Sequence, residues 1–188
     1  MKNKIFGIGL SRTGTRSLGE ALTLLGYRTA SFVSHKTEEQ GKTTWFAGDF
    51  ETDSLADFDA AVDLPIPIFY PQLDERYPGS KFILTIREPE SWLASVRRHW
   101  ARWPITDDSA GRYRQMLRLA MYGMHGFSAA RMKSVYETHV HKVRRYFRAR
   151  PQDLLVIDIS QGEGWEKLCP FLNVAVPLSK FPWLNKGG

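Results

Sequence analysis

The sequence predicts an α/β protein in which helices cover both faces of a mostly parallel central sheet, with a helical insert before the last strand. Two observations lead to this fold class. Short apolar runs typical of buried strands alternate with segments whose apolar residues recur at helical spacing. A glycine-rich turn at residues 9–15 links the first apolar run to the first helical segment. We expect a single domain over residues 1–188, with about 100–150 mainly helical.

Four short apolar runs are predicted to be the strands of the sheet. Parallel strands are joined through helices, so their carboxyl ends meet at one edge, where ligands bind in folds of this class. We therefore expect the turns after Leu10, Val62 and Ile86 to face one crevice. The predicted strands are residues 5–10, 60–62, 81–86 and 154–159.

Five segments are predicted to be helical from apolar spacing and from end signals. Gly26 follows the first segment and Pro78 follows the second, and both residue types commonly end helices. The sequence Asp107-Asp108-Ser109 is expected to cap the fourth. The predicted helices are residues 15–25, 68–77, 90–100, a segment that starts after the cap at 107–109, and 129–148.

Composition and charge favour a globular protein with an anionic partner. The chain is 43% hydrophobic and 24% charged, which is ordinary for globular proteins. It has 26 lysine and arginine residues against 20 aspartate and glutamate residues, a formal charge of +6. Such a surplus suggests nucleic acid, an acidic membrane surface or a phosphorylated cofactor as partner.

Several kinds of protein are excluded or disfavoured. The only cysteine, Cys169, rules out an intramolecular disulfide and a cysteine-cluster metal site. No apolar run approaches about 18 residues, so no membrane span is expected. Ser11 and Arg12 interrupt the apolar start of the chain before it could form a secretory signal. A cytoplasmic protein is therefore expected.

The turn at residues 9–15 has the composition of a phosphate-binding loop. Its glycines allow the backbone N–H groups to converge, and the start of the following helix adds partial positive charge. Arg12 supplies a full charge, and Thr13, Thr15 and Ser17 supply hydroxyl groups. The alternative is a glycine-rich turn that only begins a helix.

The loop matches only the first part of the Walker A pattern GxxxxGK[ST]. Gly9 and Gly14 have the required spacing, but Thr15 replaces the lysine and Arg16 replaces the serine or threonine. The basic charge lies inside the loop instead, at Arg12. A nucleotide kinase or ATPase normally needs both missing residues, for the terminal phosphates and for magnesium.

The chain resembles the P-loop sulfotransferases, which use 3′-phosphoadenosine 5′-phosphosulfate (PAPS). The segment FGIGLSRTGTRSL is similar to the family's 5′-phosphosulfate loop, with Arg12 before Thr13-Gly14-Thr15. In FILTIREPESWLAS, Ser95 follows Arg87 by eight positions, as in the family's 3′-phosphate site. A compact subfamily shares both motifs and a late FP-x-x-N segment, here residues 181–185.

The resemblance implies a P-loop type fold and sulfuryl transfer from PAPS to a hydroxyl or amine of a small-molecule or glycan acceptor. Arg12 would stabilise charge on the leaving phosphate. Asp63, in Asp63-Leu64-Pro65, replaces the family's usual histidine base; it either takes the acceptor's proton or only caps a turn. No metal, nucleic acid or oligomeric state is predicted. The implied cofactor-binding residues are Ser11, Arg12, Thr13, Gly14, Thr15, Arg16, Ser17, Arg87 and Ser95.

Other functions remain open from the residues alone. A small-molecule or nucleoside kinase with a degenerate loop would use Asp63, after its strand, to hold magnesium. A non-enzymatic protein could bind nucleic acid through the basic and aromatic segments 97–103 and 144–148. An inactive relative could keep the fold and bind the cofactor weakly.

Overall fold

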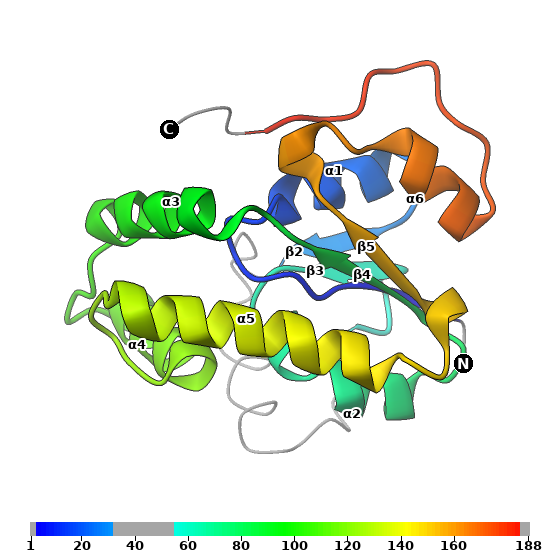
Figure 1. The fold of residues 1–188 in the computed structure, drawn as a ribbon. Helices are drawn as coiled ribbons and strands as arrows, with labels where there is room; N and C mark the ends of the chain where they lie inside the picture. Colours follow the sequence, from blue (N-terminus) through cyan, green and yellow to red (C-terminus); the bar gives the residue numbers. More distant parts are fainter. Residues whose placement is uncertain (1–2, 32–54, 185–188) are drawn as a thin grey trace.

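Five parallel strands form the central sheet of the computed structural model, which describes residues 3–31 and 55–184 (Figure 1). The strand order is β2-β3-β1-β4-β5, so β1 is central, with β3 and β2 on one side and β4 and β5 on the other. The strands are β1 (Ile5–Gly7), β2 (Thr29–Ser31), β3 (Ala60–Val62), β4 (Lys81–Thr85) and β5 (Leu154–Ile157). The four predicted strands are present, and β2 is an addition that the sequence analysis did not include.

Within the described residues, six α-helices accompany the sheet, and three short 3₁₀ turns connect elements. Asp108 caps α4 as predicted, since its side chain accepts a hydrogen bond from the N–H of Gly111. The predicted helix 68–77 is instead a 3₁₀ turn, η1 (Ile66–Ile68), followed by a shorter helix. The helices are α1 (Thr15–Leu24), α2 (Tyr70–Arg76), α3 (Pro89–Arg102), α4 (Ser109–Tyr122), α5 (Ala129–Tyr146) and α6 (Trp165–Leu172).

The helices cover both faces of the sheet. Helices α1 and α6 lie on one face, and α2 and α5 lie on the other (Figure 1). Alternate residues of β1 point to the two layers: Ile5 packs with Leu18 and Leu22 of α1, whereas Phe6 packs with Phe147 beside the C-terminus of α5. The fold is therefore the three-layer α/β arrangement that the sequence predicts.

A third apolar cluster holds α3, α4 and α5 together beside the sheet. Trp92, Val96 and Trp100 recur every four residues along α3 and are buried. The Trp92 ring lies 4.6 Å from the Tyr136 ring of α5, measured between centroids. This cluster fixes α3 at the carboxyl edge of the sheet. No helix among the described residues combines the length and apolar character that crossing a membrane requires.

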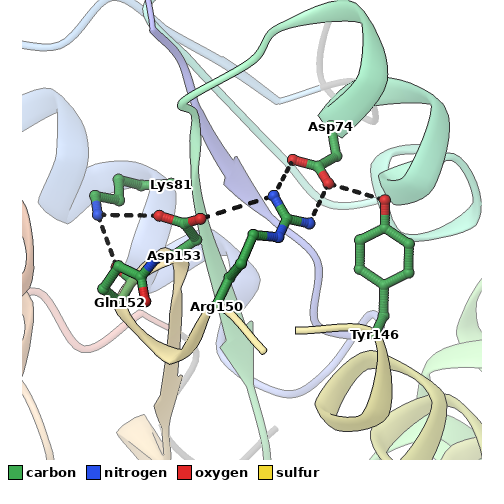
Figure 2. Close-up of polar contacts among 6 residues, drawn as sticks. All are labelled: Asp74, Lys81, Tyr146, Arg150, Gln152 and Asp153. Atoms are coloured by element: carbon green, nitrogen blue, oxygen red, sulfur yellow. Dashed lines mark hydrogen bonds and ion pairs between the residues drawn. The ribbon is translucent and has the colours of Figure 1, made fainter. Parts of the chain in front are cut away.

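A polar network ties α2 and α5 to the opposite, amino edge of the sheet (Figure 2). The guanidinium of Arg150 donates to both carboxylate oxygens of Asp74, and the Tyr146 hydroxyl donates to the same carboxylate at 2.8 Å. Asp153 lies 3.7 Å from Arg150 and 3.4 Å from the ammonium of Lys81, the first residue of β4. This network is structural, because it lies at the end of the sheet remote from the predicted crevice.

Candidate active site

The loop between β1 and α1 runs so close to β4 that its first glycine has no room for a side chain. A Cβ atom at Gly9 would lie 1.9 Å from Thr85 Oγ1 and 2.5 Å from the Thr85 carbonyl oxygen. Gly14, immediately before α1, has φ of 103°, which glycine adopts readily. Both glycines of the predicted phosphate loop are therefore required by the local geometry.

The start of α1 is open to an anion. Gly14 provides no side-chain cap, and the first turn contains no acidic residue. Within the described residues, the backbone N–H groups of Thr15 and Arg16 have no acceptor. Unpaired N–H groups together with the helix dipole attract phosphate and sulfate groups. This geometry fits a phosphate-bearing ligand at the N-terminus of α1.

The hydroxyl groups of the loop differ in their surroundings. Thr13 is buried and donates to the Leu10 carbonyl at 2.6 Å, with the Thr85 hydroxyl also 2.6 Å away, so it braces the loop against β4. Ser17 is buried and accepts the N–H of Leu184 at 3.0 Å. The hydroxyls of Thr13 and Ser17 are thus engaged within the protein, while Arg16 is exposed on the first turn of α1.

Asp63, directly after β3, is bound to the same loop. Its carboxylate accepts hydrogen bonds from the hydroxyls of Ser11 at 2.6 Å and Thr15 at 3.2 Å. It also accepts the N–H of Leu64 at 2.8 Å, which is the turn-capping role considered from the sequence. The side chain is buried, and its backbone φ of 67° is uncommon outside glycine. A carboxylate held by three donors beside the loop could also accept a proton from a bound molecule.

Two arginines converge on the other side of the loop. Arg12 Nε donates to the Ser95 hydroxyl at 3.1 Å, and Arg87 Nη1 donates to the Arg12 carbonyl at 3.4 Å. Burial lowers the pKa of Arg12, and the positive charge of Arg87 lowers it further, while Asp63 opposes the change. Two guanidinium groups held this close repel each other, so a shared anion would stabilise both.

The turns after β1, β3 and β4 thus meet at the carboxyl edge of the sheet, as expected. One pairing differs from the expectation that Arg87 and Ser95 act together. Arg87 Nε donates to Ser91 Oγ at 3.0 Å, whereas Ser95 contacts Arg12. Ser91 was missed by the sequence analysis, although its position four residues after Arg87 is the spacing at which helical side chains meet.

Two aromatic residues hold these turns in place. The Trp92 indole N–H donates to the Ser11 carbonyl at 3.0 Å, and this connects α3 to the loop. The Tyr136 hydroxyl of α5 donates to the carbonyl of Arg87 and accepts its N–H at 2.9 Å. The site is therefore supported by buried groups of the third apolar cluster.

His99 lies one helical turn after Ser95 and is half-buried. Burial lowers its pKa, the positive charge of Arg12 lowers it further, and Asp63 opposes the change. The lowered pKa favours the neutral imidazole, which interacts with the charges of both Arg12 and Asp63. Among the described residues, no group of three or more histidine, cysteine, aspartate and glutamate side chains could hold a metal ion.

Comparisons with known proteins agree with the resemblance. The family profile described as "Sulfotransferase domain" matches residues 4–188. The chain is 30% identical over 210 aligned residues to "Ava biosynthesis cluster protein M" of Aspergillus versicolor, covering 95% of this chain and 79% of that protein. The fold is similar to the crystal structure of a sulfotransferase from Alicyclobacillus acidocaldarius, with a TM-score of 0.55 and 17% identity over 96% of this chain and 84% of that one.

Proposed function

This chain belongs to the sulfotransferase family, and on that premise we propose that it transfers a sulfuryl group from PAPS to a hydroxyl or amine. The convergence of Arg12, Arg87 and the uncapped start of α1 is the observation that carries the proposal. It provides positive charge and free N–H groups for an anionic ligand with more than one phosphate. The acceptor is a small molecule or a glycan.

Each residue of the site has a role in this proposal. Arg12 and the N–H groups at the start of α1 bind the 5′-phosphosulfate and stabilise the charge left on the phosphate. Arg87, with Ser91 and Ser95 along the same face of α3, binds the 3′-phosphate. PAPS supplies the activated sulfuryl group when it is bound.

Asp63 is the proposed general base. It would take the proton of the acceptor hydroxyl or amine as the new bond to sulfur forms. Its hydrogen bonds from Ser11 and Thr15 fix its orientation toward the loop. Thr13 and Ser17 support the loop, so their contribution to binding is through the backbone.

One observation also favours a kinase. Asp63 follows a strand and accepts hydrogen bonds from loop hydroxyls, which is where a P-loop kinase places a magnesium-binding carboxylate. The loop nevertheless has Thr15 where such a kinase has its phosphate-binding lysine. The two functions differ in their nucleotide and in their need for magnesium.

Calorimetric titration separates the two functions. We expect adenosine 3′,5′-bisphosphate to bind without magnesium and more tightly than ATP with magnesium. Arg87→Ala should weaken binding of the bisphosphate, because it removes a charge-assisted contact to phosphate. Arg145→Ala, which removes an exposed charge on α5, is the matched control for net charge. Tighter binding of ATP with magnesium would instead support the kinase, and binding of neither would indicate a non-catalytic relative.

Arg12→Ala tests the catalytic step. We expect sulfuryl transfer to fall by about 10²–10³-fold, because the variant lacks the charge that stabilises the leaving phosphate. Release of adenosine 3′,5′-bisphosphate from PAPS across a panel of phenols, sugars and amines measures this. The variant should keep the circular dichroism spectrum of the wild type. Full activity in a folded Arg12→Ala protein would contradict the role.

A further inference from the structure

A cavity of about 420 Å³ lies between α3, α4 and the segment that joins α4 to α5. None of its lining residues belongs to the candidate active site. Arg97 follows Ser95 by two positions on α3, which places it about 200° around the helix, on the side away from the phosphate loop. The cavity is lined by Arg97, Trp100, Ala101, Arg118, His125 and Phe127.

Arg118 is the most unusual residue of this cavity. It is only 8% exposed, and its guanidinium lies 4.2 Å from the centre of the Trp100 ring. Its Nη2 atom donates to the Trp103 carbonyl. Among the described residues, no carboxylate lies within ion-pair distance of it. Burial lowers the pKa of Arg118, and the charge of Arg114 lowers it further.

A buried cation is normally paired with an anion, because leaving it alone in a poorly hydrated site is costly. The ring of Trp100 and one carbonyl oxygen satisfy Arg118 in part but leave its charge uncompensated. The bidentate geometry of a guanidinium suits a carboxylate or sulfate group. The missing counter-charge is therefore best supplied by a molecule that enters the cavity.

The remaining lining residues extend the same pattern. Arg97 lies over the Phe127 ring at 5.7 Å, and His125 is exposed at the edge of the cavity. Three of the six lining residues are basic, two are aromatic, and none is acidic. Flat ring surfaces next to guanidinium groups match an aromatic ring that carries a negative group.

We propose that this cavity binds a small aromatic anion, with its carboxylate or sulfate ester on Arg118 and Arg97 and its ring against Trp100 and Phe127. The site is distinct from the donor site, and the proposal does not depend on the proposed enzymatic function. Both anion types share the chemistry that the guanidinium groups recognise.

Titration with phenyl sulfate and with benzoate, followed by tryptophan fluorescence, tests the proposal. We expect saturable binding of at least one of them and no binding of neutral phenol. Arg97→Ala, an exposed position that should fold normally, is expected to weaken binding by about tenfold through loss of one charge-assisted contact. Arg118→Met should abolish binding, and Arg145→Ala should leave it unchanged.

A competition experiment places the ligand. Saturating adenosine 3′,5′-bisphosphate should leave the affinity for phenyl sulfate unchanged, and Arg97→Ala should leave the affinity for the bisphosphate unchanged. Displacement of phenyl sulfate by the bisphosphate would overturn the proposal, since the anion would then occupy the donor site. Equal binding of phenol, no saturable binding of either anion, or wild-type affinity in a folded Arg97→Ala protein would also overturn it.

Discussion

Arg12 and Asp63 share an uncommon backbone conformation, and they lie on facing turns of the same site. Both have positive φ, and with Asn173 they are the three such non-glycine residues in the described part of the chain. A left-handed conformation costs a residue with a side chain about 1–2 kcal/mol. The hydrogen bonds to Asp63 and Ser95 hold these residues in place, which is typical of residues positioned for function.

Asp63→Asn separates the two roles of Asp63. Asparagine keeps an oxygen that can accept the Ser11 hydroxyl and the Leu64 N–H, but it cannot take a proton at neutral pH. We expect kcat to fall by about 10²-fold or more while the affinity for adenosine 3′,5′-bisphosphate is retained. Steady-state kinetics and calorimetry measure this. An asparagine variant with wild-type kcat would show that Asp63 only caps the turn.

Sequence reasoning predicted which candidate residues meet at one edge of the sheet but not all of their contacts. Spacing placed Arg12, Asp63 and Arg87 at turns that parallel strands bring to one edge. It did not show that Thr13 faces Thr85, because that contact joins residues 72 positions apart. Nor did it show that Arg87 contacts Ser91 while Ser95 contacts Arg12. These pairings depend on the rotation of α3 relative to the loop.

At the scale of elements, patterns predicted the buried strands and the longer helices best. Strand β2 was missed because Thr29–Ser31 has three residues and no apolar run. Helix α6 was missed because it is short and contains Pro170. The helix predicted at 68–77 begins later because Pro67 and Pro71 divide the segment into a 3₁₀ turn and a helix. Short or proline-containing elements are set by packing rather than by local pattern.

The network in Figure 2 should contribute measurably to stability. Arg150→Ala leaves the Asp74 carboxylate, whose side chain is 9% exposed, without its main partner. We expect a loss of about 1–3 kcal/mol in the free energy of unfolding. Urea denaturation measures it. Lys133→Ala, which breaks the exposed pair with Glu90, is the control and should change stability by less than about 1 kcal/mol. Equal effects of the two variants would contradict a special role for the network.

Acid should destabilise the fold through His139, a buried residue of α5 that contacts the residue after β1. His139 Nε2 donates to the Ile8 carbonyl at 2.7 Å. Burial lowers the pKa of His139, the Ile8 carbonyl opposes the change, and Lys142 lowers the pKa further. The unfolded chain therefore takes up a proton below about pH 6.5 before the folded protein does, so stability falls as pH falls.

The measurement is the free energy of unfolding by urea between about pH 7 and about pH 5, the range in which histidine titrates. We expect a smaller decrease in His139→Gln than in the wild type. Some decrease should remain, because the pKa of His99 is also lowered, first by burial. Identical pH dependence in the wild type and the variant would show that His139 is not responsible.

For the whole molecule, the order of the strands determines where the candidate active site is formed. β1 is central, and its neighbours β3 and β4 deliver Asp63 and Arg87 to the two sides of the phosphate loop. The alternation of strands and helices predicted every strand of this sheet except the edge strand β2. The cavity around Arg118 could not be predicted, because its residues come from two helices and a connecting segment with no shared period.

Donor binding should stabilise the entire fold. A ligand that binds only the native state adds about 2.7 kcal/mol at 100 times its Kd. For a chain of this size we expect adenosine 3′,5′-bisphosphate to raise Tm by about 5–10 °C at that concentration. Thermal unfolding followed by circular dichroism measures it. At the same concentration, Arg87→Ala should show a smaller rise and Arg145→Ala the full rise. No rise in wild-type protein would contradict binding to the native state.

The hydrogen bond from the Trp92 indole to the carbonyl of Ser11 makes the phosphate loop spectroscopically visible. Trp92 is completely buried, so solvent does not compete for its N–H group. The chemical shift of that proton depends on the length of a hydrogen bond whose acceptor belongs to the loop. In a protein labelled with nitrogen-15, one of the six indole signals, assigned through Trp92→Phe, would report any change in this hydrogen bond when a ligand is added. The indole N–H of Trp92 is therefore a natural NMR probe whose hydrogen-bond acceptor belongs to the loop itself.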